Sequence, residues 1–196
     1  MAKRKINMRQ ISQKISRSNG FKKAMMQRAT DKFKDVKDTL VSNFNNHPIT
    51  QEIEGGPGGS NVSGTLGGYG NLFSFIGFHN NSDPIAPLRR LINKNLQLLR
   101  GPRTRITRNR IYQTYKVAYP DIGEFYKYSP SPWDGRSWIH GVEKGLSGFG
   151  HYMYGKFNGS RSGTGVQSTS SKRTKSYKAM EYISEILRDF KRDIKT

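Results

Sequence analysis

The sequence lacks cysteine, has few acidic residues and contains no long apolar run. Without cysteine there are no disulfide bridges and no thiolate metal sites, which is typical of a protein from a reducing compartment. No stretch reaches the roughly 18 apolar residues of a membrane span. The charged start is not followed by the apolar run of a signal peptide. We therefore expect a soluble protein that is not exported and has no membrane partner.

The scarcity of acidic residues leaves a large positive excess. The chain has 34 Lys and Arg against 14 Asp and Glu, a formal charge of +20 over 196 residues. This balance predicts association with nucleic acid, anionic lipid or an acidic protein surface. Only 33% of the residues are hydrophobic and 21 are glycine. The composition therefore predicts one domain in which part of the chain becomes ordered only against a partner.

The first residues form a basic arm, residues 1–18. From Met1 to Lys37 there are twelve Lys or Arg and two Asp. Met8, Ile11 and Ile15 have helical spacing, which predicts a short helix that ends at Asn19-Gly20. Because so few apolar residues could dock it, we expect the arm to be extended or partly helical and to lie on a neighbouring subunit. Residues 19–196 are then a single domain.

Three amphipathic helices are predicted in that domain. Apolar residues recur every three or four positions from Phe21 to Phe44, which predicts one long helix that ends before Pro48. A second helix is expected over residues 83–101 and a third over residues 177–194. A short helix is expected between a cap at Ser137 and Gly145.

Strands are predicted in the middle of the chain. Residues 47–53 are expected to form a short strand, and residues 71–78 a strand that is covered on both faces. Alternation from Ile111 to Tyr119 predicts a long strand, with residues 123–129 pairing back on it and another strand over 149–157. The predicted fold class is α+β, with a central antiparallel sheet or a small β-sandwich between N-terminal and C-terminal helices.

Two glycine- or serine-rich loops, residues 55–70 and 158–175, are predicted to be flexible. Glycine makes ordering costly, so we expect the first loop to become ordered by contact in an assembly. Within this assembly loop Leu66 and Tyr69 are the expected anchors. The glycines that give the loop its freedom are Gly64, Gly67 and Gly68.

The sequence contains no convincing catalytic, cofactor or metal motif. "GHYMYGKF" has the glycine and lysine spacing of a P-loop, but Phe157 stands where a Ser or Thr must hold magnesium. The four histidines are scattered, and only His140 lies one helical turn from a carboxylate, Glu143. We therefore expect a protein that is not an enzyme and that holds no cofactor.

A run without carboxylates is the strongest functional feature. Between Pro84 and Pro120 there are nine Lys or Arg and no Asp or Glu. Arginine favours bidentate contact with phosphate or carboxylate, so the run predicts a polyanion-facing surface, although solvated faces of a helix and a hairpin would also carry such charges. The tyrosines of this region fit sheet packing or base stacking. The candidate polyanion-facing residues are Arg103, Arg105, Arg108 and Arg110, with Lys3, Arg4 and Lys5 of the arm.

The order of these segments resembles a known family. A basic helix, "HPITQEIEGG", "SNVSGTLGGYGNLFSFIGF", further strands, "PWDGRSWIHGVEKGLSGFGHY" and a final helix are similar in order to tailed-bacteriophage neck and tail-completion proteins, with "SGTLGGYGNLFSFIG" in the place of that family's small-residue stretch. The sequence lacks the usual Asp-Thr-Gly of the family and has a longer basic arm. The order of segments matches over most of the chain, but the motif itself is short.

The resemblance implies a structural virion protein at the head–tail junction, assembled in the host cytoplasm as a ring, commonly of six copies. Its expected partners are connector or portal-side proteins and tail-tube or tail-terminator proteins. Packaged DNA that passes through the ring is a further expected partner. The alternative that the charge supports is a basic nucleic-acid-binding module of the ribosome-associated or nucleoid type.

Overall fold

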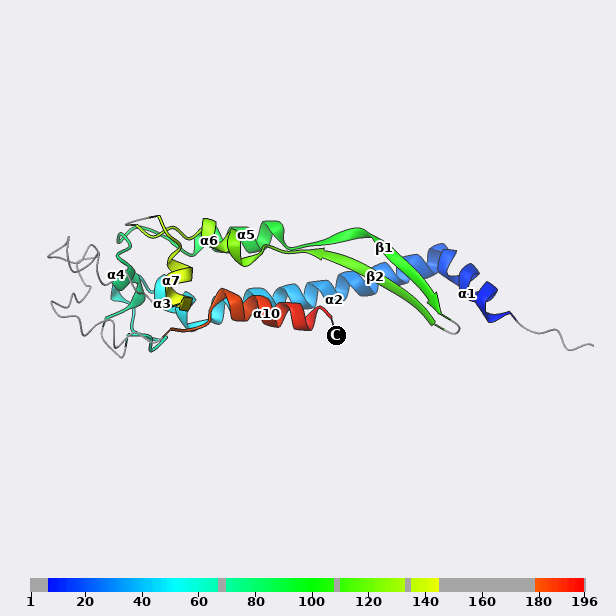
Figure 1. Ribbon diagram of the computed structural model, residues 1–196, viewed down its shortest axis with the longest axis horizontal. Helices are drawn as coiled ribbons and strands as arrows, with labels where there is room; N and C mark the ends of the chain where they lie inside the picture. The colour runs from blue at the N-terminus through cyan, green and yellow to red at the C-terminus, as the bar shows by residue number, and fades with distance from the viewer. Residues whose placement is uncertain (1–6, 67–69, 108–109, 133–134, 145–178, 196) are drawn as a thin grey trace, which may run out of the picture.

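The computed structural model describes residues 7–66, 70–107, 110–132, 135–144 and 179–195. The molecule is elongated (Figure 1), with helices α3, α4 and α7 at one end and helix α1 with the tip of a β-hairpin at the other. From here on, the arm means residues 7–30 together with the hairpin, a wider segment than the basic arm 1–18 predicted from the sequence. The remaining described residues, 31–96 and 119–195, are the head.

Helix α2, Asn19–Asn46, runs along most of the molecule and confirms the long predicted helix. Helix α1, Met8–Arg17, confirms the short helix of the basic segment. The two helices are separated at Ser18, whose backbone is extended and whose hydroxyl accepts a hydrogen bond from the Phe21 amide at 3.3 Å. The break therefore falls at a serine N-cap, and Asn19-Gly20 already belongs to α2.

The hydrophobic core lies entirely in the head. It is built from the second half of α2, from α3 (Pro48–Glu54), α4 (Leu72–Ile76), α5 (Ala86–Asn95), α6 (Ile122–Lys127), α7 (Trp138–Lys144) and α10 (Ile183–Asp193). Trp138 stacks on Tyr182 at 6.1 Å between ring centroids, and Tyr182 stacks on Phe44 at the same distance. These three rings join the last helix to α2 and α7.

Two predicted strands are helices in the structure. Residues 47–53 were expected to be extended, but Pro48 begins α3, and the His47 ring nitrogen Nδ1 accepts the Ile49 amide at 3.2 Å. Residues 71–78 were expected to be a strand, but α4 occupies 72–76 with all five side chains buried. Proline is favoured in the first turn of a helix, so Pro48 can begin α3 directly after the end of α2. A short helix that is buried on all sides shows no amphipathic period.

The hairpin also differs from the prediction. The helix expected over 83–101 ends at Asn95, and Gln97–Thr107 is strand β1. It pairs in antiparallel fashion with β2, Arg110–Ala118, which confirms the predicted strand but gives it another partner. Residues 123–129, the expected partner, lie largely in α6, because the Asp121 carboxylate caps the Glu124 amide at 2.8 Å.

The remaining predicted elements are two helices and two segments near the end of the chain. Helix α7 follows the expected cap, since the Ser137 hydroxyl accepts the His140 amide at 3.1 Å. Helix α10 buries Ile183, Ile186, Leu187 and Phe190, as its apolar spacing predicted. The strand expected over 149–157 and the loop 158–175 lie outside the described residues. The fold class is α+β, as predicted, and within the described residues its sheet is the two-stranded hairpin.

A candidate polyanion-binding arm

The hairpin has two different faces. In its register Arg105 lies opposite Tyr112 and Arg103 opposite Thr114. Since side chains alternate along a strand, these residues share one face with Arg110 and Lys116. The burial pattern of β2 alternates in step: residues 110, 112, 114 and 116 are exposed, while 111, 113, 115 and 117 are half-buried. The exposed side is called the outer face below.

The outer face is basic. Arg103 and Arg105 on one strand and Arg110 and Lys116 on the other are all exposed. Tyr112, which is 46% exposed, lies between them. Residues two apart in a strand are about 6.8 Å apart, a spacing that suits successive phosphates of a nucleic-acid chain. The outer face can therefore bind phosphates or carboxylates through its cations and stack a planar group on its tyrosine.

A bulge shapes the base of the hairpin. The register shifts between Leu99 and Arg103, so that β1 has two more residues there than β2. Gly101 lies in this insertion with φ of 94°, a conformation that favours glycine, and Pro102, which has no amide hydrogen to donate, follows it. Bulges increase strand twist and curvature, and the hairpin curves along α2 toward α1 (Figure 1).

Helix α1 packs against both strands of the hairpin and against the start of α2. The side chains that it buries are Ser12 and Ser16. Its apolar residues Met8, Ile11 and Ile15 are 50%, 41% and 45% exposed. No apolar side chain of the described arm belongs to the buried core. The arm is thus held by polar and half-buried contacts.

The arm has charge of one sign only. No Asp or Glu occurs in residues 7–30, in β1 or in β2. Carboxylates therefore cannot neutralise its cations from within the arm, and the field of a single-sign surface extends further than that of mixed charges. The cations of the described arm are Arg9, Lys14, Arg17, Lys22, Lys23, Arg28, Arg100, Arg103, Arg105, Arg110 and Lys116.

Part of the predicted polyanion surface is brought together by the hairpin. Arg103, Arg105 and Arg110 share the outer face, and Lys116 extends it. Lys116 is one of the nine cations of the run without carboxylates, but it was not among the candidate polyanion-facing residues, although its even spacing from Arg110 along β2 was the available signal. The other predicted residues, Lys3, Arg4, Lys5 and Arg108, lie outside the described residues.

The predicted assembly loop is tied to the head where the structure describes it. The buried Glu52 carboxylate accepts the Ser63 amide at 2.9 Å, the Leu72 amide at 2.7 Å and the Asn61 side-chain amide at 3.1 Å. Asn71 donates to the carbonyls of Pro57 at 3.0 Å and Gly59 at 2.7 Å. The same two side chains hold both ends of the segment, so hydrogen bonds within the chain fix its base.

The proposed anchors of that loop are placed only in part. Leu66 is 6% exposed and belongs to the core, so its position does not support a role in binding a neighbouring subunit. Gly64 has φ of 65°, as a tight turn requires. Gly67, Gly68 and Tyr69 lie outside the described residues. Among the described residues of this segment, Val62 is an exposed apolar side chain, at 52%.

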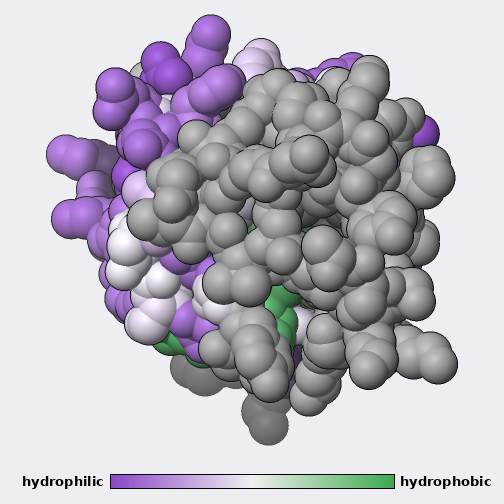
Figure 2. All heavy atoms as spheres, turned by 90° about the vertical axis from the view of Figure 1, so that its left-hand side faces the viewer, coloured by the Kyte–Doolittle hydropathy of each residue, from purple (hydrophilic) through white to green (hydrophobic). Residues whose placement is uncertain are grey.

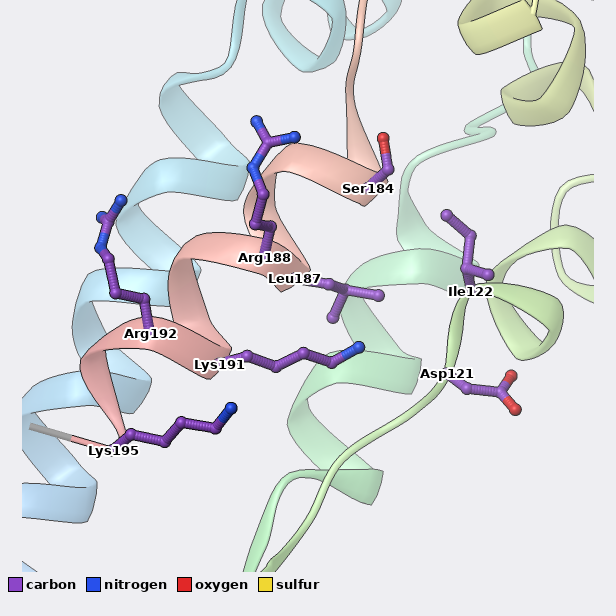
Figure 3. A pocket seen from close by; sticks show the side chains of 8 residues that line it. All are labelled: Asp121, Ile122, Ser184, Leu187, Arg188, Lys191, Arg192 and Lys195. Atoms are coloured by element: carbon purple, nitrogen blue, oxygen red, sulfur yellow. The ribbon is translucent and has the colours of Figure 1, made fainter.

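A second basic surface lies on the head. Helix α10 and the start of α6 enclose an open groove of about 740 Å³ with Ile122 and Leu187 among its apolar lining. Figure 3 shows Lys191 of α10, and Lys195 just after the end of that helix, extending toward the side of Asp121. The Lys191 ammonium also lies 5.4 Å from the centre of the Tyr119 ring. Arg188 and Arg192 complete the lining, and both pair with carboxylates of their own segment.

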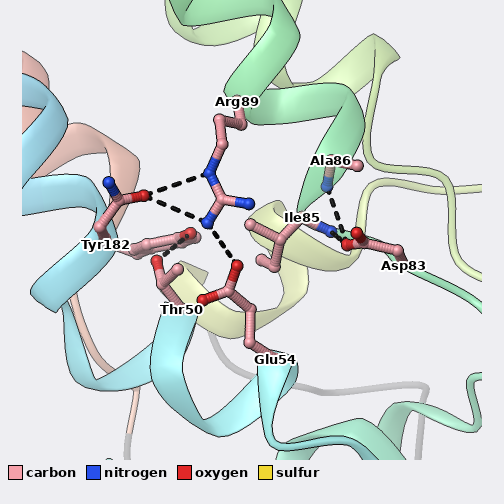
Figure 4. Close-up of polar contacts among 8 residues, drawn as sticks. Thr50, Glu54, Asp83, Ile85, Ala86, Arg89 and Tyr182 are labelled. Carbon is pink, nitrogen blue, oxygen red and sulfur yellow. Dashed lines mark hydrogen bonds and ion pairs between the residues drawn. The ribbon is translucent and has the colours of Figure 1, made fainter.

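A group of polar side chains in the head is joined by hydrogen bonds and an ion pair. Arg89 donates to Asn45 at 3.2 Å and pairs with Glu54, while Thr50 and Tyr182 share a hydrogen bond of 2.7 Å (Figure 4). Burial raises the pKa of Tyr182 well above its ordinary value. These contacts join α2, α3 and α5 to the segment before α10.

Glu143 connects α7 to the final helix. Its carboxylate accepts the Tyr182 and Ser184 amides at 3.2 and 2.8 Å and the Tyr126 hydroxyl at 3.1 Å. Burial, with the charge of Glu143 beside it, raises the pKa of Tyr126 to about 12. The carboxylate thus caps α10, and the His140–Glu143 pair that the sequence suggested is used for packing: the His140 ring lies edge-on to Tyr126 at 5.3 Å.

Over the described ranges, no group of three or more His, Asp or Glu side chains is placed to hold a metal ion. None of the helices in these ranges is long and apolar enough to cross a membrane. Seen from the head (Figure 2), the described surface is hydrophilic along its upper margin, with a small hydrophobic area lower down. The outer face of the hairpin and the exposed side of α1 are therefore the main candidates for a functional surface.

Comparison with known proteins found no match: neither a family model, nor a curated protein, nor a solved structure is similar to this chain. The features of the chain that bear on its function are therefore its charge, its shape and the order of its segments.

Proposed function

We propose that this protein is a non-catalytic structural subunit of the head–tail junction of a tailed bacteriophage, where copies form a ring, commonly of six, between the portal side and the tail. The observation that carries the proposal is the arm. It extends from a compact head, contributes no fully buried apolar residue to the core and is basic along its length. Such a segment gains its burial and charge compensation from other molecules.

The order of segments is the second support, because it is similar to that of neck and tail-completion proteins. In a ring the arms of successive subunits would form a positive collar, whose partners are packaged DNA or the acidic surfaces of adjoining virion proteins. The proposed location is the virion neck, after assembly in the host cytoplasm.

The test measures mass in solution by light scattering and by electron microscopy of stained particles, for the full chain and for a variant without residues 1–18. A ring subunit should give a discrete multiple of 22.3 kDa, alone or with a partner ring. The shortened variant should stay folded, because all of the described core follows residue 39, and should fail to assemble. An unfolded variant would contradict the proposal, since the arm would then be part of the core.

The second candidate function is a basic nucleic-acid-binding module, and the outer face of the hairpin favours it. Four cations and an exposed tyrosine on one strand pair are suited to a nucleic-acid backbone and a stacked base. Such a module should remain a monomer or dimer and bind a 30-base-pair duplex with an affinity that falls steeply with salt. A ring mass combined with weak duplex binding would exclude this alternative.

A further inference from the structure

Helix α1 exposes the side that a surface helix normally hides. Met8, Ile11 and Ile15 are spaced i, i+3 and i+7, which places them on one face, and each is at least 41% exposed. Ser12 and Ser16 occupy the neighbouring face and are only 8% exposed. The hairpin thus covers the serines and leaves the apolar stripe outward.

The setting of this stripe is basic. Lys14 lies beside the stripe, Arg9 and Arg17 lie further round the same helix, and no carboxylate occurs before Asp31. Three apolar residues at i, i+3 and i+7 form the pattern by which an amphipathic helix enters an apolar groove of another protein. Lys14 beside the stripe and the other cations of the helix favour a groove with an acidic rim.

From this exposure and charge we infer that α1 is a docking helix that inserts Met8, Ile11 and Ile15 into an apolar, acid-rimmed groove of a different protein. The inference is independent of the head–tail proposal, because it uses only the surface of α1.

Other possible partners of the exposed stripe on α1 fit the observations less well. Nucleic acid would satisfy the cations but leave the stripe exposed to water. The described groove on a second copy, between α10 and α6, is itself lined by four cations and would repel α1. An anionic bilayer favours a wide apolar face with large side chains, whereas this stripe is narrow and the adjoining face of α1 is buried against the hairpin.

The test uses calmodulin as a stand-in for such a partner, because its groove is acidic, lined with methionine and exposed only when calcium is bound. Binding of the full chain is measured by calorimetry with the calcium-loaded and calcium-free forms. The calcium-free form keeps the acidic charge but hides the groove. We expect at least tenfold tighter binding to the loaded form.

Two double variants distinguish binding through the stripe from non-specific binding through exposed apolar side chains. Ile11→Gln with Ile15→Gln should weaken calcium-dependent binding at least tenfold, and glutamine maintains the helix. Val62→Gln with Tyr128→Gln removes two comparably exposed apolar side chains of the head and should change nothing. Circular dichroism checks that both variants keep their helix content.

Four results would overturn the inference. They are equal binding to both calmodulin forms, absence of binding, binding that survives the stripe variant, and a stripe variant that instead loses affinity for vesicles of phosphatidylcholine and phosphatidylserine. There is also a fifth: if the stripe variant converts an oligomer of the free protein to monomers, a second copy covers α1 and the inference fails.

Discussion

The head and the arm differ in the contacts that hold their elements together. In the head, buried aromatic and aliphatic side chains are joined by Glu52, Glu143 and Arg89, whose hydrogen bonds link separate helices. In the arm, a long helix end, α1 and the hairpin meet through serines and half-buried side chains, and all the charge is positive. Stability is therefore concentrated in the head, while the arm is exposed to interact with other molecules.

The largest difference should appear when one aromatic ring is removed from each region. Phe73→Ala removes a fully buried ring that packs 5.4 Å from the Phe78 ring, and should lower the free energy of unfolding by about 3–5 kcal/mol. Tyr112→Ala removes a 46% exposed ring of the outer face and should change it by no more than about 0.5 kcal/mol. Urea unfolding followed by circular dichroism gives both values. Equal losses would show that the arm shares the core of the head.

The elements that the sequence predicted best are the helices with a long, periodic apolar stripe. The stripes of α2 and α10 extend over several turns, so each specified both the helix and its buried face. Helix α4 has five residues, all buried, and gives no such period. Helices α3 and α6 did carry a signal in Pro48 after His47 and in Asp121 three residues before Glu124, and the correct interpretation was a helix start.

The candidate site was predictable as charge but not as geometry. The lack of carboxylates is a property of composition, and it identified the basic stretch. The pairing of β1 with β2 was not predicted, because residues 97–101 were assigned to the preceding helix, and this pairing decides that Arg103, Arg105 and Arg110 share one face. The exposure of Met8, Ile11 and Ile15 could not be inferred, because their spacing is equally typical of a helix that buries them.

A loss somewhat smaller than that of Phe73→Ala is expected for the buried carboxylate of the head. Glu52→Ala leaves the buried amides of Ser63 and Leu72 without their acceptor, at a cost of roughly 2–3 kcal/mol in the free energy of unfolding. Glu52→Gln keeps one acceptor oxygen and should lose less. Hydrogen exchange should show protected Ser63 and Leu72 amides in the isolated wild-type protein. Fast exchange of both amides would instead support the predicted flexible loop.

The next effect concerns binding and tests the arm. Arg105→Gln with Arg110→Gln removes two cations of the outer face and should weaken binding to a 30-base-pair duplex roughly 10–100-fold at low salt, and lower the salt slope by about 2. Lys94→Gln with Lys127→Gln makes the same change of charge on exposed residues of the head. Fluorescence anisotropy across a salt series compares the two pairs. Equal losses would mean that net charge, and not the hairpin, governs binding.

The smallest effect is a pH dependence that belongs to the head alone. Burial lowers the pKa of His47, although the nearby Glu181 backbone and the Glu143 charge act in the opposite direction. The Glu185 carboxylate lies 4.0 Å from His47 Nε2 but is too exposed to reverse this lowering of the pKa. As the pH falls, His47 therefore takes up a proton in the unfolded chain before it does so in the folded protein. Its contribution to the free energy of unfolding is constant above about pH 6.5 and decreases below it, by no more than about 1.4 kcal/mol per pH unit. Protonation would also compete with the hydrogen bond that Nδ1 accepts from the Ile49 amide.

The matched variant for this pH dependence is His47→Asn, since asparagine can cap α3 but does not titrate in this range. Unfolding in urea between pH 7.5 and pH 5.5 should show a decline for the wild type that the variant lacks, while shortening the chain by residues 1–18 should leave the decline in place. If the variant declines equally, another group carries the pH dependence. If the shortened chain loses the decline, the arm and the head are coupled, and the division between them drawn from the burial pattern is wrong.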